Sequence, residues 1–375
     1  MKTKPSILAV LALSSPALAG VIYVDVAATG VNDGSSWTNG YTSLSSAIAA
    51  ASSLDEIRVK QGVYGPVSLK SGVRIYGGFD GTETRAADSN PAAHRTVINA
   101  GGARQAVRSI GNDRRTILRG FVITGGAAKD DEAGGGVYLE NSNAVFTDCV
   151  FRNNSAEFAG GAVANYFGGS PTFANCRFVD NGGGSGRPTP VGGGAVYNHD
   201  GSPTFINCLF HGNKAGDGGA VVSLDGAINI VNCTFTNNEA TQRHAGALFD
   251  NMGRAVVRNC ILWNNRAALA GAGEIYNHPR DGVPTSVAFS DVKGGWPGEG
   301  NADADPLFVD PVGGDYRLQS ASPLGAAGNR NALPPDVADL DWDGDTTEPV
   351  SRDLDLLLRS DPTIVEMGAL RRIGS

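Results

Sequence analysis

The sequence has no excess of basic residues, which argues against a nucleic-acid-binding surface. It contains 30 Lys and Arg residues against 38 Asp and Glu residues, for a net charge of −8. Binding to a phosphate backbone requires clustered positive charge, so we expect no nucleic acid among the partners. The acidic excess is local, because the segment 336–366 contains ten acidic residues and only Arg352 and Arg359 as basic ones. The rest of the chain is nearly neutral.

Long apolar runs are also missing. No stretch approaches the roughly 20 apolar residues that span a bilayer. The short apolar run 7–13 follows Lys2 and Lys4 and precedes the small residues of 17–19, a pattern typical of a secretory signal. We interpret residues 1–19 as a signal peptide, with a buried N-terminal strand as the alternative. The mature chain is then secreted or held at the cell surface without a transmembrane segment.

Amphipathic runs of helical period and recurring leucines are scarce, which argues against helical and leucine-rich repeats. Glycine, in contrast, accounts for 52 of 375 residues, about twice its usual share. Hydrophobic residues still make up 41% of the chain, enough to bury a core. This composition predicts many tight turns between short strands.

Two short sequence patterns alternate along the middle of the chain. One is centred on a cysteine and ends with an asparagine five positions later; the other is Gly-Gly-Ala-Val, at 160–163, 193–196 and 218–221, with a looser copy at 245–248. From the second pattern to the next cysteine the distance is 12 or 13 residues, whereas the return distance varies from 13 to 20. The five cysteines, spaced by 27, 32, 25 and 27 residues, are Cys149, Cys176, Cys208, Cys233 and Cys260.

A repeat of this length with strands of three to five residues predicts a right-handed parallel β-helix with three short strands per coil. The constant half of the repeat forms one side of the solenoid, and loops of variable length gather on the other. We expect the β-helix over residues 20–330, a capping helix near 44–51, and an acidic extension, 331–375, packed on the last coils. An open end of a β-helix exposes unpaired backbone, which explains the need for a cap.

Equivalent positions in successive coils lie about 4.8 Å apart and form columns. We expect the cysteines to be mostly free, buried thiols, because stacked side chains run parallel; one or two disulfides are the alternative. Two asparagine columns are predicted to form ladders, with separate turn hydrogen bonds as the alternative. The first contains Asn154, Asn181, Asn213, Asn238 and Asn265, and the second Asn175, Asn207, Asn232 and Asn259.

The repeated patterns resemble those of chlamydial polymorphic outer-membrane proteins, which are surface adhesins. Over residues 21–370 the chain is more similar to secreted bacterial β-helix proteins of the pectate-lyase-like superfamily. The matching sequences are YVD at 23–25, NDGSSW at 32–37, IYGGF at 75–79, DADPLF at 303–308 and MGA at 367–369. The resemblance implies the fold and a polysaccharide or cell-surface glycan as partner. It does not imply one activity, because architecture alone defines most members.

Polar residues of the variable half are the candidate catalytic groups. Known enzymes of this fold use carboxylates with Ca²⁺ and a basic residue, or paired carboxylates, and only Asp130-Asp131 resembles such a motif. The leading hypothesis is non-catalytic binding of polysaccharide or another surface component along the side of the solenoid. The alternative is a polysaccharide lyase or glycoside hydrolase in these loops, and a plain solvated loop face is also open. The candidates are Asp130, Asp131, Lys214, Asp217, Arg243 and His244.

The acidic extension contains one pattern typical of a metal site. Asp339, Asp341, Asp343 and Asp345 alternate around Gly344, like the start of an EF-hand loop. Val350 stands at the twelfth position, where an EF-hand has glutamate. We expect these four aspartates to bind Ca²⁺ and to fasten the extension, with a merely acidic turn as the alternative.

Overall fold

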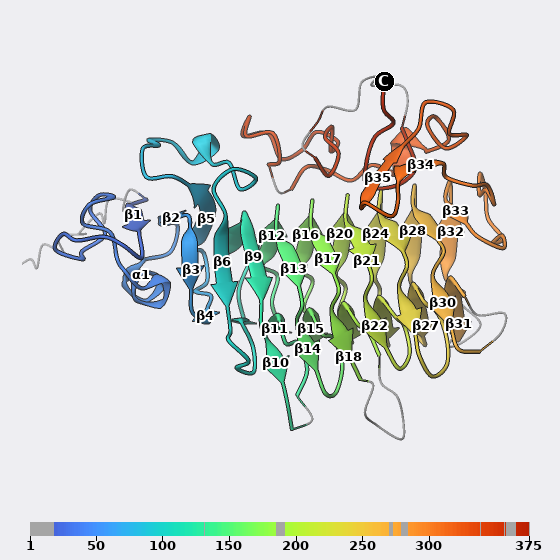
Figure 1. Cartoon of the computed structure of the whole chain (residues 1–375), viewed down its shortest axis with the longest axis horizontal. Coiled ribbons are helices and arrows are strands. Elements are labelled where there is room, and N and C mark those ends of the chain that lie inside the picture. Colours follow the sequence, from blue (N-terminus) through green and yellow to red (C-terminus); the bar gives the residue numbers. More distant parts are fainter. Residues whose placement is uncertain are drawn as a thin grey trace, which may run out of the picture.

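Each coil of the solenoid consists of short strands that pair in parallel with the same strands of the next coil. The computed structural model describes residues 19–130, 132–184, 192–269, 273–278, 284–337, 339–355, 357 and 365–374. One complete coil contains β12 (Val145–Thr147), β13 (Val150–Arg152), β14 (Ser155–Ala156) and β15 (Val163–Tyr166). These strands belong to four parallel sheets, here called A, B, D and C in that order. The coils stack side by side along the long axis in Figure 1.

Sheets A and B lie on either side of the cysteine in each coil. Besides β12, sheet A contains β1 (Val21–Val24), β2 (Glu56–Lys60), β5 (Arg74–Phe79), β8 (Ile117–Arg119), β16 (Thr172–Ala174), β20 (Thr204–Ile206), β24 (Asn229–Val231), β28 (Val256–Arg258) and β32 (Ser286–Ala288). Besides β13, sheet B contains β3 (Gly62–Tyr64), β6 (Thr96–Asn99), β9 (Phe121–Thr124), β17 (Arg177–Val179), β21 (Leu209–His211), β25 (Thr234–Thr236), β29 (Ile261–Trp263) and β33 (Asp291–Val292).

Sheets D and C follow in each coil, and the loops of variable length lie between them. Besides β15, sheet C contains β4 (Val67–Ser68), β7 (Val107–Ile110), β11 (Val137–Glu140), β19 (Val196–His199), β23 (Val221–Leu224), β27 (Leu248–Asn251) and β31 (Ile275–His278). Besides β14, sheet D contains β10 (Ala127–Ala128), β18 (Gly182–Gly183), β22 (Lys214–Ala215), β26 (Glu239–Ala240) and β30 (Arg266–Ala267). The predicted parallel β-helix is thus confirmed, and the two-residue strands of sheet D add a fourth pairing to the three predicted per coil.

The helix α1 (Leu44–Ala50) covers the N-terminal end of the solenoid, as predicted. Ser43 caps it by accepting a hydrogen bond from the Ser46 N–H at 3.3 Å. Its buried face, Leu44, Ala47 and Ile48, joins the main core. Figure 1 shows the helix at the blue end of the stack, beside β1 and β2.

The core consists of columns of identical side chains. Phe151, Phe178, Phe210 and Phe235 stack with ring centroids 4.7, 4.6 and 4.3 Å apart and nearly parallel planes. All five cysteines are buried free thiols, as expected. The buried asparagines Asn154 to Asn265 form the predicted ladder, in which each Nδ2 donates to the Oδ1 of the next asparagine at 2.7–3.1 Å.

The second asparagine column lies at the turn between sheets A and B. Asn175, Asn207, Asn232 and Asn259 all have φ near +52°, a left-handed conformation that asparagine tolerates. One side-chain bond within the column follows the ladder prediction, from Asn207 Nδ2 to Asn175 Oδ1 at 3.1 Å. Asn259 instead exchanges hydrogen bonds with the backbone of Asn329. The main role of this column is therefore to form the turns between sheets A and B. Asn259 also contacts the C-terminal segment.

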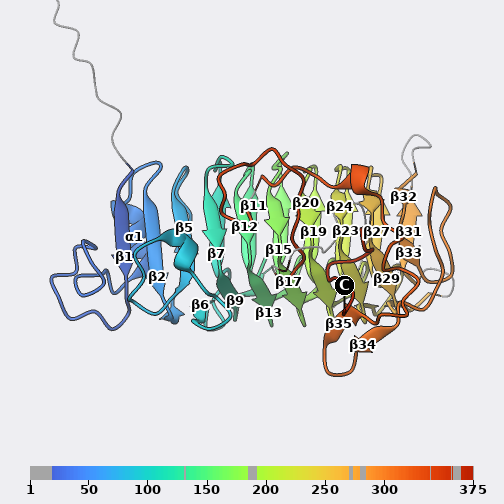
Figure 2. The ribbon, with the colours of Figure 1, turned by 90° about the horizontal axis from the view of Figure 1, so that it is seen from above.

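The parallel sheets end at β33, so the solenoid is shorter than the predicted limit of 330. The chain continues into an antiparallel hairpin, β34 (Phe308–Asp310) and β35 (Asp315–Leu318), and a short 3₁₀ helix, η2 (Arg330–Ala332); another, η1 (Ala86–Asp88), lies in an N-terminal loop. The extension packs on the last coils, as expected, only in part, through Met367, Ala369 and Leu370 against Leu209 and Ile261. Its apolar residues Leu340 and Val350 pack on sheet A in the middle of the stack, and Figures 1 and 2 show the orange-to-red segment running back over the green coils.

The structure bears on the expected absence of a transmembrane helix, but it does not describe the segment predicted to be a signal peptide. Within the part of the chain that the structure describes, no helix has the length and apolarity needed to cross a bilayer. The predicted signal peptide falls, except for Ala19, outside the described residues.

Candidate functional site

The outer face of sheet C has a row of aromatic side chains. In each strand the first and third residues point into the core, and the second and fourth point outward because side chains alternate. Parallel register then aligns the outward residues of successive coils in two columns. We call the following set the aromatic face: Tyr138, Tyr166, Tyr197, His199, Phe249 and Tyr276.

The rings of the aromatic face contact one another from coil to coil. Tyr166 has its ring centroid 5.8 Å from that of Tyr138 and 5.6 Å from that of Tyr197. Farther along, Phe249 and Tyr276 lie 5.4 Å apart. The strands β11 and β31, which hold the first and last rings, are five coil steps apart, about 24 Å at the usual strand spacing. The result is a row of partly buried rings parallel to the solenoid axis, interrupted at β23, where Val222 and Leu224 point outward.

Tyr138, Tyr166 and Tyr197 of this face keep their hydroxyl protons, because their pKa values are raised. Burial raises the pKa of Tyr166, and the neighbouring Tyr197 and Tyr138 raise it further. Burial also raises the pKa of Tyr197 to about 12. Each ring therefore combines an apolar surface with a neutral hydroxyl that can donate or accept a hydrogen bond.

A hollow of about 540 Å³ lies at one end of the aromatic face, next to the variable loops. His244 stacks on Tyr276 there, with ring centroids 3.9 Å apart. Phe249, Asn251 and His278 also line the hollow. His199 and His278 occupy one column three coil steps apart, and so they do not share a ligand.

Three of the predicted catalytic residues come together beside this hollow. Arg243 donates from Nε and Nη2 to Asp217 Oδ2 at 3.0 and 2.8 Å, and the His244 N–H donates to Asp217 Oδ1 at 2.8 Å. Asp217 is 1% exposed. Both of its oxygens are engaged by the loop itself, so it orders the loop and is poorly placed to take a proton from a substrate.

The other predicted catalytic residues lie apart from this group. Lys214 forms an ion pair with Glu239 on the next coil at 2.8 Å, and both are well exposed. Asp130 lies near Arg104 at 3.5 Å, three coil steps from the strand of Lys214. Asp131 falls outside the described residues. The six candidates therefore do not form one site.

A buried carboxylate that the sequence did not indicate ends the asparagine ladder. Glu274 occupies the alanine position of the Gly-Gly-Ala-Val pattern, and its oxygens accept the Asn265 N–H at 3.1 Å and Nδ2 at 2.5 Å. Burial raises the pKa of Glu274 to about 7. It lines an open hollow of about 630 Å³ with Lys293 and Trp296. Since both oxygens receive the last donors of the ladder, Glu274 caps the ladder.

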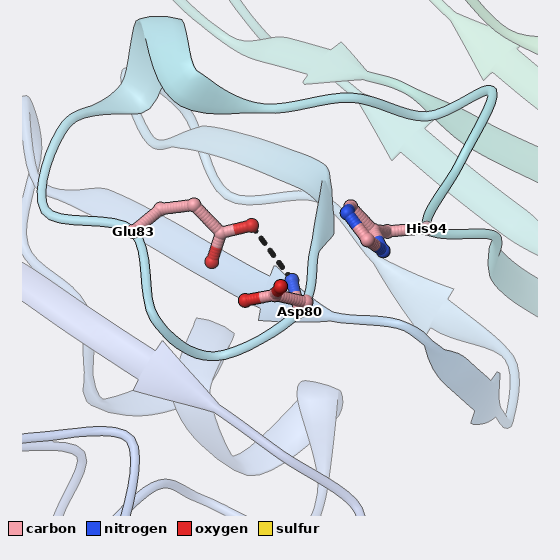
Figure 3. Close-up of side chains that lie close together, drawn as sticks. All are labelled: Asp80, Glu83 and His94. Carbon is pink, nitrogen blue, oxygen red and sulfur yellow. Dashed lines mark hydrogen bonds between the residues drawn. The ribbon is translucent and has the colours of Figure 1, made fainter.

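Two groups of possible metal ligands differ in whether their oxygens are free. In the first, Asp80, Glu83 and His94 have ligand atoms within 4.8 Å of one another, and Figure 3 shows the His94 ring beside the two carboxylates. Glu83 already accepts N–H groups of Asp80, Gly81 and Thr82 at 2.7–3.1 Å. These hydrogen bonds account for the first group as a turn.

The second group lies in the acidic extension. Asp339, Asp341 and Asp343 of the predicted calcium pattern have ligand atoms within 4.8 Å of one another. Asp345 is not among them, because its Oδ1 accepts the N–H and hydroxyl of Thr347 at 2.8 and 2.6 Å. The structure thus brings together three of the four predicted aspartates.

Comparisons with known proteins agree with the fold. Residues 96–280 match the family model described as a right-handed β-helix region. A pectate lyase of known structure superposes with a TM-score of 0.54 at 15% identity, covering 94% of this chain and 96% of that one. The pectin methylesterase from Aspergillus niger, at 14% identity over 78% of this chain and 88% of that one, gives only 0.36. No curated protein matches the sequence. The first superposition supports a right-handed parallel β-helix of pectate-lyase-like fold.

Proposed function

We propose that the protein is exported and binds an extended polysaccharide along the aromatic face of sheet C, without cleaving it. The supporting observation is the row of partly buried rings that follows the solenoid axis from Tyr138 to Tyr276. Flat apolar rings with neutral hydroxyls suit sugars, which present apolar C–H faces and hydroxyl groups together. The β-helix also occurs in a protein named as a pectate lyase.

The regular spacing of the coils supports an extended ligand over a compact one. An outward position recurs at each coil step of about 4.8 Å, so a linear chain along the axis would meet a ring on each coil from β11 to β31 except that of β23, where Val222 and Leu224 point outward. Phe167, 60% exposed, lies 5.7 Å from Tyr166 and widens the surface. The hollow at His244 and Tyr276 would hold one end of such a chain.

Cleavage in the variable loops has less support than binding. The Asp217 carboxylate and the Arg243 guanidinium neutralise each other, and Lys214 is paired with Glu239. A general base needs a free lone pair within reach of the substrate proton. In the proposed function these residues order the loops beside the aromatic face.

The experiment measures retardation of the purified protein in gels containing pectate, alginate or chondroitin sulfate. We expect retardation by at least one of them, and a loss of affinity of tenfold or more in Tyr166→Ala. Trp263→Ala serves as the control, because Trp263 is also half-buried but lies on sheet B, and it should bind normally. Retardation by none of the three, or equal losses in both variants, would contradict the proposal.

A parallel assay addresses cleavage. Incubation with the same polysaccharides should release neither unsaturated products, detected by ultraviolet absorbance, nor new reducing ends. Release that Arg243→Ala or Lys214→Ala abolishes would instead support the lyase or hydrolase.

A further inference from the structure

The acidic part of the C-terminal segment forms a closed loop. Between Asp336 and Glu348 there are six acidic residues and neither Lys nor Arg. The Asp336 N–H donates to the Glu348 carbonyl at 2.8 Å, and the Val350 N–H donates to the Pro334 carbonyl at 3.1 Å. The two ends of the loop are therefore paired, which holds the carboxylates in a small volume.

Several of these carboxylate oxygens are buried without a hydrogen-bond donor. Asp336, Asp341 and Glu348 have ligand atoms within 4.8 Å of one another. Asp336 is 1% exposed, and within the described chain its Oδ1 has no hydrogen-bond partner. Asp341 Oδ1 and both side-chain oxygens of Glu348 also have no hydrogen-bond partner within the described chain. Burying unpaired carboxylates is costly, unless a cation compensates them.

The negative charges of neighbouring carboxylates also disfavour the ionised form of Asp336. Burial raises the pKa of Asp336 to about 6, and the charges of Asp341, Glu348 and Asp339 contribute. The contrast with Asp80, Glu83 and His94 is informative, because there backbone donors already occupy the oxygens. In the 336–348 loop, Asp336 Oδ2 accepts the Leu340 N–H at 2.9 Å, but Asp336 Oδ1, Asp341 Oδ1 and both Glu348 oxygens have no such donor within the described chain.

We propose that this loop binds Ca²⁺ through Asp336, Asp341 and Glu348, with Asp339 and Asp343 as further ligands. Ca²⁺ takes six to eight oxygen ligands in flexible geometry, which suits five carboxylates from a loop. Asp336 and Glu348 lie outside the alternating pattern of the sequence, so they are new to the site. Asp345 is in neither group of ligand atoms that lie within 4.8 Å of one another, and its Oδ1 accepts the Thr347 N–H.

The position of the loop gives the ion a structural role. Arg119 of sheet A donates to the carbonyls of Asp339 and Leu340 at 3.1 and 3.3 Å, and its guanidinium lies 4.0 Å from the Trp342 ring centroid. Leu340 also packs on Val145 and its neighbours in sheet A. Bound Ca²⁺ would remove the repulsion among the carboxylates and hold the C-terminal segment on the solenoid.

The test uses the full chain, with CaCl₂ as the probe. Calorimetric titration should show binding, and the melting temperature should rise on replacing EGTA with Ca²⁺, since a ligand of the native state stabilises it. Asp341→Asn and Glu348→Gln should each lower Ca²⁺ affinity at least tenfold. Asp345→Asn, the matched control with the same loss of charge in the same loop, should stay within about twofold.

The melting temperature in EGTA shows whether each variant folds, and limited proteolysis of the C-terminal segment gives a local readout. Wild-type protein should be protected from proteolysis by Ca²⁺, and Glu348→Gln should not. Absence of calcium binding in the wild type would overturn the proposal. So would an equal loss in Asp345→Asn, or an equal response to Mg²⁺ at the same concentration.

Discussion

Two sides of the same solenoid differ in what lies over them. Over the sheet A and B side runs the C-terminal segment, where Leu340 and Val350 cover Val145 and Ala174 and the Tyr316 hydroxyl bonds to His211 Nδ1 at 2.8 Å. The apolar cluster on the outer face of sheet C contains residues of the coils and none of the C-terminal segment among the described residues. Outward apolar residues thus pack under the C-terminal segment on one side. On the other they pack on one another, with Tyr166 and Phe249 still partly exposed.

The comparison predicts that substitutions under the C-terminal segment change stability and that substitutions on the aromatic face change binding. The largest effect is expected at Arg119, which forms a buried ion pair with Asp148 at 2.7 Å. Arg119→Ala leaves that carboxylate buried and uncompensated, at a cost of about 3–5 kcal/mol in the free energy of unfolding. Urea unfolding measures it, and Arg119→Ala with Asp148→Asn should recover part of the loss. A loss below about 1 kcal/mol would contradict the predicted cost of the uncompensated Asp148 carboxylate.

The contact of Arg119 with residues 339 and 340 also marks the limit of sequence-based prediction. The ladders could be predicted because each coil returns to the same position, so a repeated residue must stack on its copies. The path of the C-terminal segment could not, because it depends on contacts between residues more than 200 positions apart, with no repeat to align them.

The candidate site was only partly predictable for a different reason. Polar loop residues were chosen for their chemistry, but the structure joins only Asp217, Arg243 and His244 to one another and pairs Lys214 and Asp130 with other residues. Tyr166 and Tyr276 follow the Gly-Gly-Ala-Val pattern or its variant, and strand alternation alone would have placed them outside. The ligands Asp336 and Glu348 had no such signal, because loop closure brings them to Asp341.

The next largest effect concerns the pH dependence of stability at the end of the asparagine ladder. The pKa of Glu274 is about 7 in the folded chain, against an ordinary value of 4.5. The folded state therefore holds the proton more tightly. The contribution of Glu274 to stability is fully present below about pH 4.5 and is lost as the pH rises through about 7, by roughly 1–3 kcal/mol.

Glu274→Gln should lack this part of the pH dependence. Thermal unfolding of both proteins between pH 4 and pH 8 measures the difference. Asp291, whose pKa burial raises to about 7, is present in both, so the comparison isolates Glu274. Parallel curves for the two proteins would contradict the prediction.

The smallest effect is expected at an exposed ion pair of the variable half. Lys214→Ala removes the pair with Glu239, whose side chain is 45% exposed, and should change the free energy of unfolding by less than about 0.5 kcal/mol. Polysaccharide affinity should also stay within about twofold. A tenfold loss of affinity, measured in the same gels, would indicate that the polysaccharide binds at sheet D and not at the aromatic face.

Hydroxyl-radical footprinting with and without a bound polysaccharide tests the division between the two sides most directly, because aromatic rings on both sides react. The account predicts that the ligand protects Tyr138, Tyr166 and Tyr276 on sheet C and leaves the oxidation of Trp263 and Trp342 unchanged. Protection of Trp263 or Trp342, with the sheet C tyrosines still reactive, would contradict it.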